Sequence, residues 1–286
     1  MTEEVDAVAS DFADRYGPWA LVLGASDGVG AAYARAMAER GVNVVLLARR
    51  RAVLDDVAAS IRSDTGVEAR AVAVDLAEPD AMARIAEATA GLEVGMVMYC
   101  AGADPNYEPF LAHSVDVALG MVQRNCVVPL QVCHHFAGAM VDRGRGGIVL
   151  VSSGGGLIGG PNMVAYGASK AFDIVMAEAL WSELHDQGVD VLGLVLGATD
   201  TPALRTLLAE RGVLPEGDDT TPIPGASTVE EVVSDAIANL ADGPTWFVGE
   251  QLREGSQILG AMPRNDAVRL MAEHGSALMN TRLGEP

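Results

Sequence analysis

Lysine is almost absent from this chain of 286 residues. Of its 19 lysine and arginine residues only Lys170 is a lysine, although lysine is normally among the commonest residues in proteins. The position of that lysine is therefore informative. Acidic residues outnumber basic ones by 39 to 19, and the net charge is −20. We expect no nucleic-acid partner, because phosphate backbones are bound by clustered basic side chains.

Long apolar runs and cysteines are also scarce. No run approaches the roughly 18–20 apolar residues of a membrane-spanning helix, and the first segment, MTEEVDAVASDFADRYG, carries acids where a signal peptide carries bases. Cys100, Cys126 and Cys133 are odd in number, lie in apolar surroundings and show no zinc-binding spacing. We therefore expect a cytoplasmic protein that has no membrane partner, no disulfide framework and no bound metal.

Short apolar runs alternate with longer helical stretches along the chain. Half of the residues are hydrophobic, which excludes a disordered chain. Apolar strands separated by crossover helices are typical of a parallel sheet that is covered on both faces. We expect one α/β domain over 1–286, a doubly wound, Rossmann-type sheet of about seven strands with helices on both faces. The expected strands are 20–24, 42–48, 69–75, 94–102, 147–153, 189–197 and 245–249, and the expected helices are 29–40, 52–63, 79–90, 115–143, 165–187 and 229–241.

Two stretches interrupt this alternation. Residues 199–227 hold a short helical segment and a loop rich in proline, glycine and aspartate. A segment of this length inside a compact fold is typical of a lid. The tail, 253–286, has a helical pattern over 265–279 with methionines available for packing.

The first expected strand runs directly into the segment GASDGVG, at the start of a helix. Glycines at this point allow a tight turn, and the free N–H groups of a helix N-terminus attract a diphosphate. The segment therefore predicts a dinucleotide site. Its candidate residues are Gly24, Ser26, Asp27, Gly28, Val29 and Gly30.

The end of the second strand indicates which dinucleotide binds. An NAD site has an acid there for the ribose 2′-hydroxyl, whereas this strand ends in Arg49 and Arg50, followed by Arg51. Because guanidinium groups suit a 2′-phosphate, we expect NADP(H), with Ser26 adding a hydroxyl. The alternative is an ordinary basic helix start. Asp75, at the end of the third strand, is expected either to accept a bond from the adenine amino group or to cap the next helix.

Lys170 lies four residues after Tyr166 in the segment YGASK, so both side chains share one helix face. A nearby cation stabilises a phenolate, and an ammonium can also bind ribose hydroxyls while passing protons. Ser153 ends the fifth strand, where doubly wound folds bind ligands. Asn125 lies inside an apolar helix, which favours a buried hydrogen-bonding role.

Together these residues resemble the short-chain dehydrogenase/reductase family, and the match covers nearly the whole chain. The matching segments are GASDGVG, Asp75, Cys100–Gly102, Asn125, Ser153, YGASK and Leu196–Thr201. The resemblance implies that Tyr166 is the general acid/base, that Ser153 orients the carbonyl, that Lys170 binds the nicotinamide ribose and stabilises the phenolate, and that Asn125 holds a relay water. It also implies cofactor contacts from Leu76, Cys100, Ala101, Gly102, Gly197, Thr199 and Thr201, besides Tyr166 and Lys170. Two residues depart from the family pattern: Cys100 replaces the usual asparagine, and Leu196 replaces the usual proline.

Within the family, GVNVVLLARR, YGASKAF and GVDVLGLVLGATDTPAL resemble hydroxysteroid dehydrogenases, especially bacterial 7β-type enzymes, and related 17β-hydroxysteroid and 3-oxoacyl reductases. This implies NADP(H)-dependent interconversion of a ketone and a secondary alcohol on a bulky apolar substrate, with a steroid as first choice. The alternatives are a 3-oxoacyl reductase, a non-catalytic NADP-binding regulator and a nucleotide-sugar epimerase or dehydratase. A homodimer or homotetramer is expected through the long helices that flank the fifth strand, where His134 and His135 are structural or interface residues. The candidate pocket walls are Leu157, Ile158, Met163, Leu207, Leu208 and Met262.

Overall fold

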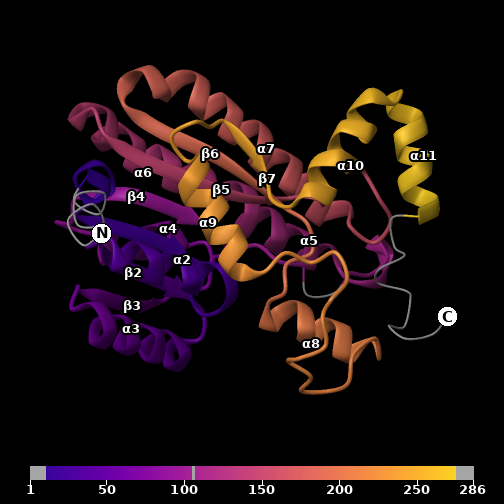
Figure 1. Cartoon of the computed structure of the whole chain (residues 1–286), viewed down its shortest axis with the longest axis horizontal. Helices are drawn as coiled ribbons and strands as arrows, with labels where there is room; N and C mark the ends of the chain where they lie inside the picture. The colour runs from indigo at the N-terminus through magenta and orange to yellow at the C-terminus, as the bar shows by residue number, and fades with distance from the viewer. Residues whose placement is uncertain (1–10, 105–106, 275–286) are drawn as a thin grey trace.

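The computed structural model describes residues 11–104 and 107–274, and is built on one seven-stranded parallel sheet (Figure 1). The strands run in the order β3-β2-β1-β4-β5-β6-β7. The chain therefore moves outward in one direction from β1 and in the other direction from β4, and the carboxyl ends of these two strands mark the crevice where such sheets bind ligands. The strands are β1 Trp19–Leu23, β2 Asn43–Ala48, β3 Ala69–Ala73, β4 Val94–Tyr99, β5 Gly146–Ser153, β6 Val189–Leu196 and β7 Thr245–Phe247.

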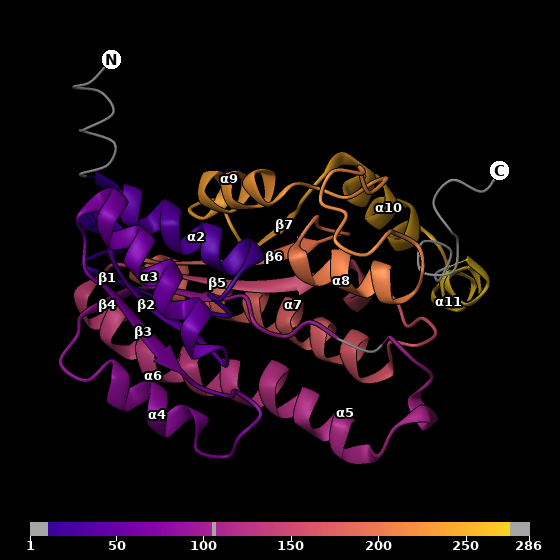
Figure 2. The same ribbon diagram turned by 90° about the horizontal axis from the view of Figure 1, so that it is seen from below.

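Helices cover both faces of the sheet, as Figure 2 shows. On one face α2 Gly28–Glu39, α3 Arg51–Thr65 and α9 Val229–Asn239 bury their apolar sides. On the other face α4 Ala81–Ala88, α6 Val128–Arg143 and α7 Val164–Leu184 do the same. Strands β1 and β4 are buried at every position because helices cover both faces of the sheet. Strands buried in this way need apolar residues throughout, as the segments WALVL and VGMVMY show. The expected doubly wound sheet is confirmed.

The helix expected over 115–143 is divided into three parts. The α-helix α5 (Val115–Val122) is followed by one π turn, η2 (Gln123–Val127), and then by α6. A π turn accommodates one extra residue within a helix, and such turns occur frequently at functional sites. The apolar pattern alone did not reveal it, because every residue of the stretch is still helical.

The C-terminal part of the chain contains a helix that the sequence analysis did not predict. Helix α10 (Glu250–Ala261) precedes α11 (Arg264–His274), and both stand on the side of the molecule where α7 begins (Figure 1). Helix α10 contains two glycines and no fully buried residue, and the partly buried Leu252 and Leu259 lie on one side of it. The part of the predicted tail helix beyond 274 lies outside the described residues.

Residues 199–227 form a small unit with packing of its own. Helix α8 (Pro202–Glu210) is capped by Thr201, whose hydroxyl accepts a bond from Leu204 N at 3.2 Å. Arg205 binds Asp200 through two bonds of 2.6 Å. The apolar cluster beneath this unit is separate from the two sheet cores and comprises Leu208, Val213, Leu214 and Ile223. Within the described part of the chain, no helix is both long and apolar enough to cross a membrane.

Candidate active site

The glycine turn joins β1 to α2, and close approach requires its glycines. A Cβ on Gly24 would lie 2.8 Å from the backbone N of Ala101, and φ at Gly24 is +88°. A Cβ on Gly30 would lie only 2.2 Å from the carbonyl oxygen of Gly24. Larger residues would therefore open the turn. Gly28 begins α2, and its missing Cβ leaves room for Thr201, whose methyl group would lie 3.1 Å away.

The arginines after β2 point in different directions. Arg50 donates to Ser26 Oγ at 2.9 Å and forms an ion pair with Asp27, so these three side chains gather beside the glycine turn. Arg51 binds Asp55, one turn further along α3, at 2.8 Å. Its place in the basic run therefore reflects a helix-surface ion pair and not the nucleotide site. Arg49 is exposed at the end of β2.

Asp75 does not cap the helix that follows it. Its Oδ1 accepts a bond from Ala77 N at 3.0 Å, whereas α4 begins at Ala81. The carboxylate thus folds the turn after β3, and the capping alternative is wrong; the adenine contact stays a prediction. Burial lowers the pKa of the neighbouring Arg124 guanidinium, and the charge of Arg49 lowers it further while that of Asp75 opposes the shift. Arg49, Asp75 and Arg124 therefore act on one another at this end of the crevice.

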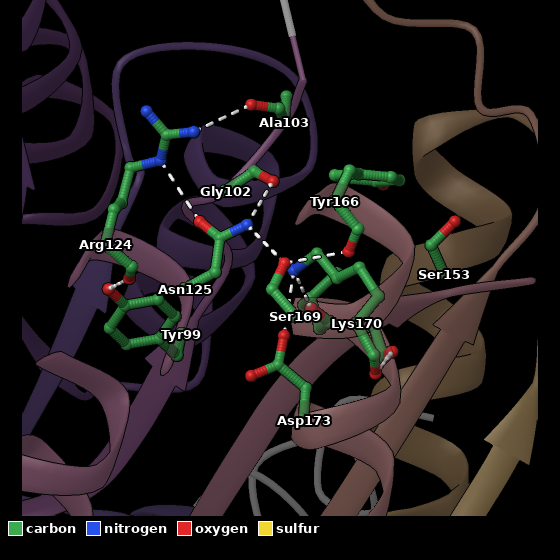
Figure 3. A network of polar contacts seen from close by, with 12 residues as sticks. Tyr99, Gly102, Ala103, Arg124, Asn125, Ser153, Tyr166, Ser169, Lys170 and Asp173 are labelled. Carbon is green, nitrogen blue, oxygen red and sulfur yellow. Dashed lines mark hydrogen bonds and ion pairs between the residues drawn. The ribbon is translucent and has the colours of Figure 1, made fainter. Parts of the chain in front are cut away.

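Ser153 and Tyr166 face the same space at the carboxyl end of β5 (Figure 3). Ser153 Oγ accepts a bond from Gly155 N at 3.2 Å. A Cβ on Gly155 would lie 3.5 Å from both Ser153 Oγ and Tyr166 Cε1, so the missing side chain leaves the hydroxyl and the ring facing one gap. A small cavity of about 50 Å³ reaches Tyr166 from the side of α5.

Lys170 lies one turn after Tyr166 on α7, and only 4% of its surface is exposed. Its ammonium donates to the carbonyl of Val151 at 2.9 Å and to Asp173 Oδ2 at 2.9 Å. A Cβ on Gly102 would lie 3.2 Å from Lys170 Nζ, so the left-handed glycine at φ +126° lets the loop after β4 pass close to the ammonium.

Asn125 is fully buried in the π turn and connects two segments of the crevice. Its amide nitrogen donates to the carbonyl of Gly102 at 3.2 Å and to Ser169 Oγ at 2.9 Å. Its amide oxygen accepts from Arg124 Nε at 3.1 Å. Ser169 in turn donates to the carbonyl of Tyr166 at 2.8 Å. The loop after β4, the π turn and the first turns of α7 are thereby joined by one hydrogen-bond network (Figure 3).

Three members of this network were missed by sequence reasoning: Arg124, Ser169 and Asp173. Asp173 had a readable signal, because Tyr166, Lys170 and Asp173 follow one another at the spacing i, i+4, i+7 of one helix face. Arg124 and Ser169 had none, since each also bonds to a segment that is distant in sequence: Arg124 donates to Ala103 O at 3.0 Å, and Ser169 accepts from Asn125.

The remaining cofactor candidates lie along the crevice. Cys100 continues the pairing of β4 with β1 through its N–H, which donates to Leu23 O at 2.9 Å. Burial raises the pKa of the Cys100 thiol to about 12, so the thiol stays protonated. Thr199, after β6, is buried and its hydroxyl finds no partner among the described residues. A dinucleotide fits this crevice, since the nearest atoms around Gly24 and Gly30 are backbone atoms and the Thr199 hydroxyl is left for a ligand. The others on this path are Val29, Leu76 and Ala101, with Gly197 at the end of β6.

Two residues of the expected pocket wall line a large cavity in the described part of the chain. Ile158 and Met163 line a cavity of about 540 Å³ between the loop after β5, the start of α7 and the Arg264 side of α11. Leu208 is buried in the separate cluster under α8, where it packs against the insertion itself. His134 and His135 are exposed on α6.

Comparison with known proteins identifies similar chains. A family model described as short chain dehydrogenase matches residues 18–212. The 7β-hydroxysteroid dehydrogenase of Clostridium sardiniense is 33% identical over 262 residues, which is 90% of this chain and 95% of that protein. A solved structure from work on 7β-hydroxysteroid dehydrogenase stereoselectivity has a TM-score of 0.83 at 32% identity and covers 91% of this chain and 98% of its own. A short-chain dehydrogenase from Sphingobium yanoikuyae in complex with NADPH has a TM-score of 0.72 at 26% identity, with 94% and 98% covered.

Proposed function

Because this chain belongs to the short-chain dehydrogenase family, an oxidoreductase family whose members act on hydroxyl and keto groups, we propose that it transfers hydride between NADP(H) and a bulky apolar ketone or secondary alcohol. The observation that carries the proposal is the convergence of Ser153 and Tyr166 on one gap beside the buried Lys170. A steroid is the preferred substrate class, because the similar chains include 7β-hydroxysteroid dehydrogenases.

In the proposed reaction the bound nicotinamide supplies or accepts the hydride. Tyr166 gives a proton to the carbonyl oxygen during reduction and takes one from the alcohol during oxidation. Ser153 donates a hydrogen bond to the same oxygen as negative charge develops on it. Lys170 holds the ribose hydroxyls and stabilises the phenolate form of Tyr166. Asn125, held on three sides by hydrogen bonds, fixes the loop at Gly102 against α7 and holds the relay water.

The substrate class is tested by the loss of NADPH absorbance with a panel of ketosteroids and 3-oxoacyl esters. We expect turnover of ketosteroids, with the kcat/KM of the best steroid exceeding that of any 3-oxoacyl ester. A higher kcat/KM for the 3-oxoacyl esters would show that the substrate class is acyl and not steroid. No turnover with any ketone would contradict the proposed activity. The alternative function, a non-catalytic NADP-binding regulator, would then be favoured.

NADP(H) is the proposed cofactor because Arg49 and Arg50 follow β2, and Ser26 of the glycine turn lies beside Arg50, so that all three can supply donors for a 2′-phosphate. Replacing Arg49 with aspartate removes one charge-assisted hydrogen bond and adds repulsion. We expect the ratio of kcat/KM for NADP to that for NAD to fall by about 10- to 100-fold, since such a bond contributes about 1.5–3 kcal/mol.

The control is Arg51→Asp, which makes the same charge change two residues away at a side chain bound to Asp55. We expect it to leave the cofactor ratio close to that of the wild type. Equal effects of the two substitutions would show that overall charge, and not a contact of Arg49, sets the preference.

We propose that 199–227 is a lid over the cofactor within a single catalytic domain, and that the protein works in the cytoplasm. The insertion packs on an apolar cluster of its own, and its first helix begins beside the glycine turn. A unit with an independent core can move as one body against the sheet.

The cytoplasmic location is proposed because the three cysteines are free thiols, which a reducing compartment preserves.

We also propose that two copies of the chain pair through α5, α6 and α7. These helices expose Leu119 (57%), Leu130 (52%) and Val175 (63%), and exposed apolar side chains that gather on one layer are typical of a protein interface. We expect the wild type to sediment as a dimer or tetramer and Val175→Glu to sediment as a smaller species. Ile258→Glu, at an equally exposed site on α10, is the control and keeps the wild-type mass. A monomeric wild type would contradict the pairing.

A further inference from the structure

Asp173 is a buried carboxylate next to the proposed active site, and it bonds to the ammonium of Lys170. Only 2% of Asp173 is exposed, and its Oδ2 lies 2.9 Å from Lys170 Nζ. Its Oδ1 is buried without a hydrogen-bond partner among the described residues. Burial raises the pKa of the Asp173 carboxyl, and the charge of Lys170 opposes that shift. An acid in such a place is costly for folding, so packing alone gives no reason for it.

The groups that face Asp173 from the surrounding elements leave Lys170 as its counter-ion. Tyr99 of β4, Cys126 of the π turn and Cys133 of α6 all feel its negative charge. Burial raises the pKa of each of these three groups, so they are neutral at physiological pH. The main-chain carbonyl of Val151, on β5, accepts a second bond from the ammonium at 2.9 Å. Lys170 is therefore held from two sides, by one carboxylate and one carbonyl.

The geometry points to Asp173 as a positioning residue that holds the ammonium of Lys170 and offsets part of its positive charge, and that thereby sets the pH range in which Tyr166 exchanges its proton. This inference rests on the proposed function, in which Lys170 stabilises the phenolate of Tyr166. A cation that is half-neutralised by a buried acid stabilises a nearby phenolate less than a free cation does. Removing the charge of Asp173 should therefore leave more of the positive charge of Lys170 to act on Tyr166.

The test is Asp173→Asn, which keeps the shape and an oxygen acceptor for the ammonium but removes the charge. We expect the pH at half-maximal rate of alcohol oxidation to move down by about one unit, the smaller end of what a neighbouring charge produces. The second measurement needs neither cofactor nor turnover. The ultraviolet absorbance of the Tyr166 phenolate, obtained by subtracting the Tyr166→Phe protein in each background, is expected to appear at lower pH in Asp173→Asn.

Two controls separate charge from packing. Asp173→Glu disturbs the packing but keeps the charge, and we expect it to keep the wild-type pH midpoints. Glu183→Gln removes an exposed acid from the same helix and is also expected to leave them unchanged. If Asp173→Asn does not fold, Asp173→Ser removes the same charge with a smaller side chain that still accepts a bond.

Midpoints that stay at the wild-type value, or move up, in the neutral variants would overturn the role of Asp173. Absence of any oxidoreductase activity in the wild type would instead overturn the proposed function. The phenolate titration distinguishes the two failures, because it reports on Asp173 and Tyr166 whether or not the protein turns over a substrate.

Discussion

Tyr166→Phe is expected to abolish turnover while NADPH still binds. The substitution removes one oxygen atom, the proposed proton donor, and leaves the ring that faces Ser153 in place. Proton transfer by a positioned side chain contributes about 10²–10⁴-fold to a rate, so we expect kcat to fall by that factor at every pH. Steady-state kinetics gives kcat, and NADPH fluorescence gives the dissociation constant, which should rise by no more than about tenfold, the loss of one neutral hydrogen bond of about 0.5–1.5 kcal/mol.

The matched control is Tyr33→Phe on α2. Tyr33 is fully buried, and its hydroxyl has no hydrogen-bond partner within the described ranges. Removing that oxygen therefore breaks no hydrogen bond within the described ranges and should leave kcat unchanged. Substantial activity in Tyr166→Phe would show that another group supplies the proton, and the assignment of the active site would have to be abandoned.

The second large effect is expected for Gly30→Ala. The new Cβ would lie 2.2 Å from Gly24 O and 2.8 Å from Gly24 C, and both are backbone atoms of the turn. Because the backbone cannot yield as a flexible side chain does, the glycine turn must open. We expect NADPH affinity to fall by about 100-fold or more, the loss of two or three backbone hydrogen bonds to a charged group at about 1.5–3 kcal/mol each.

Gly138→Ala provides the comparison for this substitution. Gly138 lies in α6, and a Cβ there would meet no atom within 4 Å. We expect unchanged NADPH affinity and a rise in unfolding free energy of about 0.5–1 kcal/mol, the usual advantage of alanine over glycine inside a helix. If Gly30→Ala bound NADPH as well as Gly138→Ala does, the glycine turn would not be the diphosphate site.

The architecture was predictable because parallel strands and their crossover helices leave separate marks along the chain. Each of the seven expected strands overlaps an observed one, and the apolar β1 and β4 fall at the centre of the sheet. Helix α10 was missed because its two glycines weaken its helix propensity. Its apolar side is short, since only Leu252 and Leu259 are partly buried on it.

At the site, local spacing was informative and long-range contact was not. The one-turn separation of Tyr166 and Lys170 placed both on one face of α7, and the same rule extends to Asp173. The bond between Asn125 and Ser169 joins residues 44 positions apart, so no spacing rule reaches it. The i,i+4 spacing of Arg51 and Asp55, by contrast, is a local signal that the sequence carries.

The π turn between α5 and α6 has a consequence for insertions and deletions. In a regular helix each residue turns the following side chains by about 100°, so one extra residue changes which side of α6 faces the sheet. With the turn in place, α6 presents Val132, Phe136 and Met140 to the core while Asn125 points into the crevice. Deleting one residue of 123–127 would therefore turn either Asn125 away from the crevice or the apolar side of α6 away from the sheet. The number of residues in this turn therefore sets the orientation of Asn125 relative to the core-facing side of α6. Substitutions at 123–127 are expected to be tolerated more readily than insertions or deletions there.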